Sequence, residues 1–190
     1  MQTPDEVLRF WLEEVGPKGW YIGGAALDDD IRARFEALWQ EALDDGLHEW
    51  LTQPRTALAY LLLTDQFPRN MFRGEARAFS TDPMARKAAK HAIDREFDMR
   101  VEEPERQFFY LPLMHSECLT DQDRCVRLML TRMPETGADN LLHAKAHREV
   151  IRRFGRFPFR NDALARCSSE DERTFLAEGG YPAIVKALRG

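Results

Sequence analysis

The spacing of the apolar residues is the feature of this sequence that most constrains its fold. Apolar side chains recur every three or four positions, as in Ile31, Phe35, Leu38 and Trp39. This is the repeat of a helix that buries one face. No stretch between turn signals alternates strictly between apolar and polar residues, as a half-buried strand does. The sequence therefore predicts an all-α protein with about eight helices.

Capping signals divide the periodic stretches into separate helices. Thr3 and Glu6 form a capping box around Pro4, and a second capping box is formed by Ser169 and Glu172. We expect the first helix to end at Gly16-Pro17 and a glycine-rich loop to follow at 17–27. The other expected helices cover 28–46, 54–67, 80–97, 104–133 with an interruption at Pro112, 138–154 and 169–178, with a short piece after Pro182.

Length and composition favour one soluble globular domain over residues 1–190, large enough to fold without a metal or disulfide. The formal net charge of -5 argues against nucleic acid and anionic membranes as partners. No apolar run approaches the roughly 18 residues of a membrane span, and no secretory leader is evident. Three widely spaced cysteines favour free thiols in a reducing cytoplasm.

Two similar corners follow helix ends, at residues 65–70 and 155–161. In each corner proline is expected to stop the helix, Asn to adopt the left-handed conformation, and Arg to bond the last free carbonyls. Matching corners predict helices packed as antiparallel pairs, in a tetratricopeptide-like array or a bundle.

Asp65 is the polar residue that fits the apolar pattern least well. It lies close to the line of Leu61 and Leu62 in the last turn of its predicted helix, where the dipole disfavours a negative charge. We expect it to be buried and paired with Arg69, with Arg73 and Arg160 as alternatives.

Further polar residues fall on the apolar stripe of the second half of the 104–133 segment. His115 and Gln122 share that stripe, whereas Glu117 and Asp121 lie on the opposite face if the helix is continuous. The expected role of Glu117 and Asp121 is therefore a solvated ion-pair face.

His143 and His147 have the i, i+4 spacing of metal-binding histidines on one helical face. The stretch lacks the glutamate of HExxH zinc enzymes, and no third or fourth ligand is evident. We therefore predict no metal and no cofactor, with at least one of the two histidines hydrogen-bonded in the core.

Long strings of this sequence resemble the domain-of-unknown-function 924 family, from about Val7 to Leu176. The resemblance implies a tetratricopeptide-like helical fold, and it brings no established activity, cofactor or catalytic residue. Phe159 stands where the family usually shows His, and Met114 replaces a frequent glutamate. The strings that carry the resemblance are Leu61-Leu62-Leu63-Thr64-Asp65-Gln66-Phe67-Pro68-Arg69-Asn70 with Phe72-Arg73-Gly74, Glu105-Arg106 with Tyr110-Leu111-Pro112-Leu113-Met114-His115-Ser116-Glu117, and Phe154-Gly155-Arg156-Phe157-Pro158 with Arg160-Asn161.

Our leading hypothesis is a helical scaffold or binding module for a peptide or a small anionic ligand, because arginine forks suit carboxylate and phosphate. The alternative is a hydrolase-like enzyme with Asp65, His115, His147 and the corner arginines around one pocket. A third interpretation is a buried polar network without any ligand. The candidate ligand-binding residues, polar side chains of the corners and stripes, are Asp65, Arg69, Asn70, Arg73, His115, Gln122, His147, Arg160 and Asn161.

Overall fold

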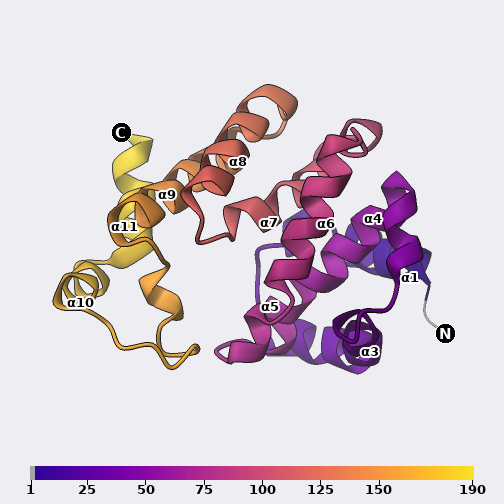
Figure 1. Cartoon of the computed structure of the whole chain (residues 1–190), viewed down its shortest axis with the longest axis horizontal. Helices are drawn as coiled ribbons and strands as arrows, with labels where there is room; N and C mark the ends of the chain where they lie inside the picture. The colour runs from indigo at the N-terminus through magenta and orange to yellow at the C-terminus, as the bar shows by residue number, and fades with distance from the viewer. Residues whose placement is uncertain (1–2) are drawn as a thin grey trace. The chain divides into compact units, whose positions relative to one another are not determined.

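The computed structural model describes residues 3–190, and these contain helices and no strand (Figure 1). The structure is 74% helical, which confirms the predicted all-α class. Its contacts divide the chain into two compact units, one up to Pro112 and one from Leu113 onward. The single domain over 1–190 and the tetratricopeptide-like arrangement stay predictions.

The first unit begins where the sequence predicts. Both bonds of the capping box between Thr3 and Glu6 are present at the start of α1. The helix continues through a π-helical stretch to Gly16, whose φ of 66° ends it. The predicted loop at 17–27 is partly wrong, because a short helix follows and the next long one starts at Ala25. The α-helices of this unit are α1 (Pro4–Leu8), α2 (Gly16–Gly19), α3 (Ala25–Leu43), α4 (Pro54–Leu61), α5 (Phe67–Met71) and α6 (Asp82–Asp94).

Pro68 does not break the helix that starts at Pro54, contrary to expectation. A π-helical turn at Leu62–Gln66 joins α4 to α5, and the chain stays helical to Met71. Proline cannot donate to the carbonyl of Thr64, one turn earlier. That carbonyl instead accepts the hydroxyl of Thr81 at 2.6 Å. A side chain from the start of α6 thus supplies the donor that Pro68 lacks.

Aromatic packing joins the π-helical stretch Arg9–Val15 to α3 and α5 in the core of the first unit. The ring of Phe67 lies 5.9 Å from Phe10, 5.4 Å from Trp11 and 4.9 Å from Phe35, centroid to centroid. All four side chains are buried. Full burial of each ring stabilises the fold by about 1.5–3 kcal/mol, and edge-to-face contacts add to this.

The predicted helical segment 104–133 contains a longer non-helical interruption than expected. After a 3₁₀ turn at Glu105–Phe109 and α7 (Leu111–Met114) at the boundary between the units, residues 115–118 are not helical. The helices that follow are α8 (Leu119–Arg132), α9 (Ala138–Phe154), α10 (Glu170–Ala177) and α11 (Gly180–Arg189). α11 is longer than the expected short piece, since Pro182 lies in its first turn, where proline is tolerated.

In the second unit, α8 and α11 both pack on α9, as the orange and yellow ribbons of Figure 1 show. One hydrophobic cluster of its core joins α9 to α10 and α11. Its members are Ala146, Val150, Ile151, Phe157, Phe175, Ile184 and Val185.

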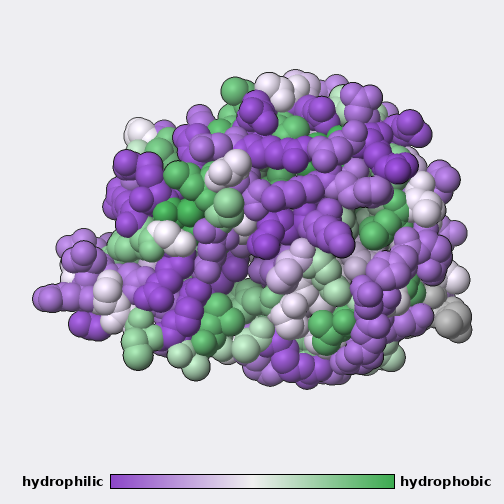
Figure 2. All heavy atoms as spheres, viewed as in Figure 1, coloured by the Kyte–Doolittle hydropathy of each residue, from purple (hydrophilic) through white to green (hydrophobic). Residues whose placement is uncertain are grey.

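Hydrophilic side chains cover most of the face drawn in Figure 2, with hydrophobic ones scattered among them. Within residues 3–190, no helix is long and apolar enough to cross a membrane.

Candidate functional site

Asp65 is buried and paired with Arg69, as predicted. Its side chain is 1% exposed, and Arg69 Nη1 lies 3.4 Å from Asp65 Oδ1. The other end of the guanidinium lies 3.0 Å from Asp82 Oδ1. Burial opposes the charge of Arg69, but the two carboxylates outweigh it and raise the pKa of the guanidinium. Arg69 is therefore a shared cation between two acids, and it ties α5 to α6.

Asn70 and Arg73 bind a carboxylate of the chain itself. Arg73 donates to both oxygens of Asp28, at 2.9 and 3.0 Å, and Asn70 Nδ2 donates at 2.8 Å. Burial alone would raise the pKa of Asp28, and the bonds from Arg73 and Asn70 bring it below its usual value. Asp28 lies in the first turn of α3 and thus holds the start of that helix against the end of α5.

The second corner has its own acid, Glu172 in α10, which is 3% exposed. Arg156 donates to both of its oxygens at 2.6 and 2.7 Å, and this fork lowers the pKa of Glu172 to about 2. Asn161 Nδ2 donates to Ser168 Oγ at 3.0 Å. The expected left-handed conformation of the corner asparagines is wrong, because Asn161 has a φ of -60° and Asn70 lies inside α5.

A second carboxylate stabilises the same corner. Glu117 accepts two bonds from Arg166 at 2.8 and 3.0 Å and one from the Phe157 N–H at 2.8 Å. These donors outweigh burial and lower the pKa of Glu117. Arg160 is buried, with its guanidinium 4.4 Å from the centre of the Phe157 ring. Glu117 is therefore an ion-pair partner of a neighbouring loop and not part of a solvated helix face.

The expectation for Asp121 is also wrong. Asp121 is 4% exposed and accepts the Ser116 hydroxyl at 2.8 Å. The cause is the non-helical stretch 115–118, which resets the helical phase and leaves Leu119 exposed instead. Gln122 is fully buried as predicted, and its Nε2 donates to the carbonyls of Met114 at 2.6 Å and Ser116 at 2.7 Å. Gln122 thus closes the loop before α8.

The histidines of α9 form a network with Tyr181 of α11. His143 Nδ1 lies 2.6 Å from the Tyr181 hydroxyl, and His147 Nδ1 lies 3.1 Å from the same oxygen and 2.9 Å from the His143 carbonyl. His115 packs edge-to-face on His147, with 6.3 Å between the ring centres. Both α9 histidines are half-buried and hydrogen-bonded. Within residues 3–190, no three His, Cys, Asp or Glu side chains are arranged to hold a metal ion.

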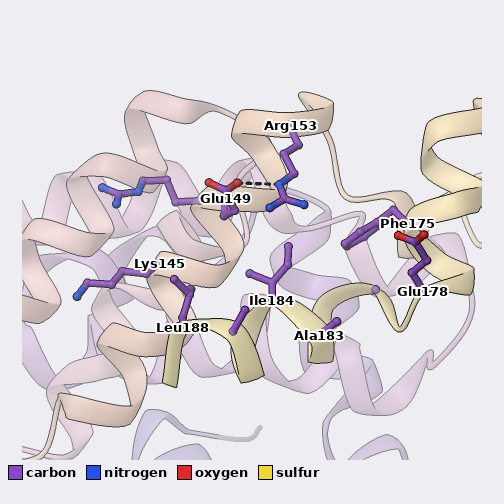
Figure 3. Close-up of a pocket in the computed structure, with 11 residues that line it drawn as sticks. Lys145, Glu149, Arg153, Phe175, Glu178, Ala183, Ile184 and Leu188 are labelled. Carbon is purple, nitrogen blue, oxygen red and sulfur yellow. Dashed lines mark hydrogen bonds and ion pairs between the residues drawn. The ribbon is translucent and has the colours of Figure 1, made fainter. Parts of the chain in front are cut away.

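A groove of about 400 Å³ opens along α9 and α11, and none of the predicted ligand-binding residues lines it. In Figure 3, Lys145 and Leu188 lie near one end of this groove, Ile184 lies in the middle, and Phe175 and Glu178 lie near the other end. The i, i+3, i+4 spacing of the apolar residues on α11 is the signal that could have predicted this face.

The candidate residues divide between the two units. Asp65, Arg69, Asn70 and Arg73 lie in the first unit, in two separate ion-pair clusters. The others lie in the second unit, where His115 and His147 meet and Asn161 joins the Glu172 cluster. A pocket that combines Asp65 with the histidines stays a prediction.

Comparison with known proteins places the chain in a family. Residues 7–180 match the family described as "Bacterial protein of unknown function (DUF924)". The chain belongs to this family. A solved structure of a protein of unknown function from Agrobacterium tumefaciens, ATU0120, is similar to it, with 41% identity and a TM-score of 0.85. The similarity covers 92% of this chain and 97% of that one. No curated protein matches the chain.

Membership of the DUF924 family confirms the resemblance seen in the sequence and adds no activity. The arginine forks of this DUF924 member are engaged by its own carboxylates, Asp28, Glu117 and Glu172. That pairing favours the interpretation of the corners as polar networks that fix helix packing. A groove along α9 and a cavity beside His147 offer space for a ligand in the second unit.

Proposed function

We propose that this DUF924 protein is a helical binding module for a small amphipathic anion, and that the α9–α11 groove is its site. The observation that carries this proposal is the asymmetric charge of an apolar groove. Its floor is formed by Phe175, Ile184 and Leu188, and its volume of about 400 Å³ suits a small ligand.

Five charged side chains line the groove, and those at its two ends give the ligand a direction. Glu149 and Arg153 form an ion pair with each other at 2.7 Å, so neither charge is left unmatched. Lys145 is exposed and has no ion-pair partner among residues 3–190, so its ammonium is available to a ligand. Arg148, one turn further along α9, carries a second positive charge and pairs with the exposed Asp123 at 3.3 Å. Glu178, at the opposite end, disfavours an anionic group there. The anionic head is therefore expected at Lys145 and the apolar tail toward Phe175.

Octanoate is the probe that tests this proposal, with binding followed by amide shifts in two-dimensional NMR. We expect saturable shifts along α9 and α11 that weaken with added salt. Lys145→Gln should weaken binding about threefold, because an exposed ion pair contributes about 0.6 kcal/mol. Lys186→Gln is the matched control, since this exposed α11 lysine does not line the groove. Equal affinity in the two variants, or shifts outside the groove, would contradict the proposal.

A cytoplasmic location is part of the same proposal. All three cysteines are free thiols, and Cys118 and Cys167 are exposed. Exposed thiols suit a reducing compartment. The enzyme hypothesis stays a prediction that we do not extend, because its residues lie in two units and its arginines have carboxylate partners.

A further inference from the structure

A second cavity of the second unit adjoins the histidine network and shares only Gly180 with the groove. Its volume is about 480 Å³, and the side chains that give it chemical character are His147, Phe159, Leu176 and Tyr181. We propose that this cavity binds a small, uncharged aromatic molecule that carries one N–H or O–H donor, of the size and kind of indole.

The hydrogen bonds of His147 determine which group it offers a ligand. Nδ1 lies 2.9 Å from the His143 carbonyl, and a carbonyl only accepts, so Nδ1 carries the proton. The Tyr181 hydroxyl accepts from this N–H at 3.1 Å and donates to His143 Nδ1 at 2.6 Å. The remaining ring nitrogen, Nε2, then has a lone pair, and no hydrogen bond to it is present within residues 3–190. His147 therefore offers an acceptor.

The surroundings of His147 select for an uncharged donor. Burial, and after it the nearby ring of His115, lowers the pKa of His147 to about 3, so the imidazole is neutral at physiological pH. Nε2 has no proton to donate to an anion, and the guanidinium of Arg160 already faces the Phe157 ring at 4.4 Å. The buried guanidinium of Arg160, which also lowers the pKa of His147, disfavours a cation there. The ligand group that suits Nε2 of His147 is therefore an uncharged N–H or O–H donor.

Phe159 provides a rigid platform for a flat ring. It is 44% exposed, although it stacks on the buried Phe157 with ring centres 5.2 Å apart and planes at 29°. Tyr181 holds it from the side, edge-to-face at 6.1 Å. Leu176, 39% exposed, adds apolar surface to the same cavity. An exposed aromatic side chain held in place on two sides can stack with a ligand at little entropic cost.

A pair of probes that differ by one donor tests the proposal. Indole should give saturable amide shifts at residues 176–182, and 1-methylindole, which lacks the N–H, should bind about fivefold more weakly. Tryptophan fluorescence does not suit this titration, because it overlaps the fluorescence of indole and because all four tryptophans lie outside the second unit. NMR avoids both problems. Equal affinity of the two probes, or no saturable shift at millimolar indole, would overturn the proposal.

Two variants test whether Phe159 and His147 are the residues that recognise indole. Phe159→Ala should weaken both probes by a similar factor of about five, because it removes the stacking surface but leaves the acceptor. Leu130→Ala, at an exposed apolar side chain away from the cavity, is the matched control and should change neither. His147→Phe should remove the preference for indole over 1-methylindole. If His147→Phe does not fold, the probe pair on the unaltered protein still decides the outcome.

Discussion

Buried carboxylates paired with arginine are the recurring arrangement at the scale of single residues. Asp28, Asp65 and Glu172 are each buried, and each meets a guanidinium within 3.4 Å. A buried charge needs such a partner, since desolvation otherwise costs several kcal/mol. Asp28 and Glu172 meet arginines 45 and 16 residues away, and Arg69 links Asp65 to Asp82 in α6. These pairs therefore specify how the helices pack more than they add to stability.

Asp65→Ala tests this account in the first unit. The variant leaves Arg69 with Asp82 as its remaining partner, so the cost should lie near 2–3 kcal/mol, below the roughly 3–5 kcal/mol of an unmatched buried charge. Denaturant melts measure it. Asp123→Ala is the control, because Asp123 is exposed and its pair with Arg148 should contribute under about 1 kcal/mol. An Asp65→Ala variant as stable as the unaltered protein would disprove the ion-pair account.

His147 makes the stability of the protein depend on pH. Its folded pKa of about 3 lies below the usual 6.5, mainly because of burial, so the unfolded state binds the proton more tightly. Stability should therefore be complete above pH 6.5 and decrease as the pH falls from there toward 3. Melts at pH 6.5 and 5 compare the protein with His147→Gln, which lacks this imidazole. The unaltered protein should lose up to about 1 kcal/mol per pH unit more than the variant, and identical slopes would contradict this.

Among the elements, those with a local signal were predictable from the sequence. The capping boxes at Thr3 and Ser169 open α1 and α10 as expected, because their bonds lie within four consecutive residues. The continuation past Pro68 was not predictable, since the donor that replaces the missing N–H comes from Thr81 in another helix. The break at 115–118 was missed as well, and with it the burial of Asp121.

Candidate sites were less predictable than helices, because the partners of a site residue come from distant parts of the sequence. The burial of Asp65 and Gln122 follows from their places on apolar stripes, and both were foreseen. The partner of Arg73 was not, because Asp28 is 45 residues away and no local pattern links the two. The cavity beside His147 depends on Tyr181, in a helix expected to be only a short piece.

Thr81 provides a test of how α4, α5 and α6 are joined. Its hydroxyl donates to the Thr64 carbonyl at 2.6 Å and accepts the indole N–H of Trp39 at 3.2 Å. Thr81→Val keeps the shape but leaves both buried groups unsatisfied, which should cost about 2–3 kcal/mol in a denaturant melt. Thr81→Ser keeps the hydroxyl and should cost under about 1.5 kcal/mol, the effect of one lost methyl group. A loss in Thr81→Ser as large as that in Thr81→Val would mean that the methyl group matters as much as the hydroxyl, and no loss in Thr81→Val would show that the two hydrogen bonds contribute nothing.

For the whole molecule, the small size of the second unit bears on whether the two units fold as one domain. The second unit, Leu113–Gly190, comprises fewer than 80 residues. Units below roughly 70–80 residues rarely gain more than about 3–5 kcal/mol from one core. We therefore expect one cooperative unfolding transition for the chain, as the sequence-based prediction of a single domain requires.

The distribution of tryptophan makes this expectation testable without dissecting the chain. Trp11, Trp20, Trp39 and Trp50 all lie in the first unit, so fluorescence reports on that unit alone, whereas far-UV circular dichroism reports on the helices of both. The two signals should give one coincident midpoint in denaturant. Ile151→Ala removes a buried side chain from the second unit and should cost about 2–5 kcal/mol. If the chain is one domain, this variant lowers the tryptophan midpoint as well; an unchanged tryptophan midpoint beside a lowered dichroism midpoint would show two independently folding units.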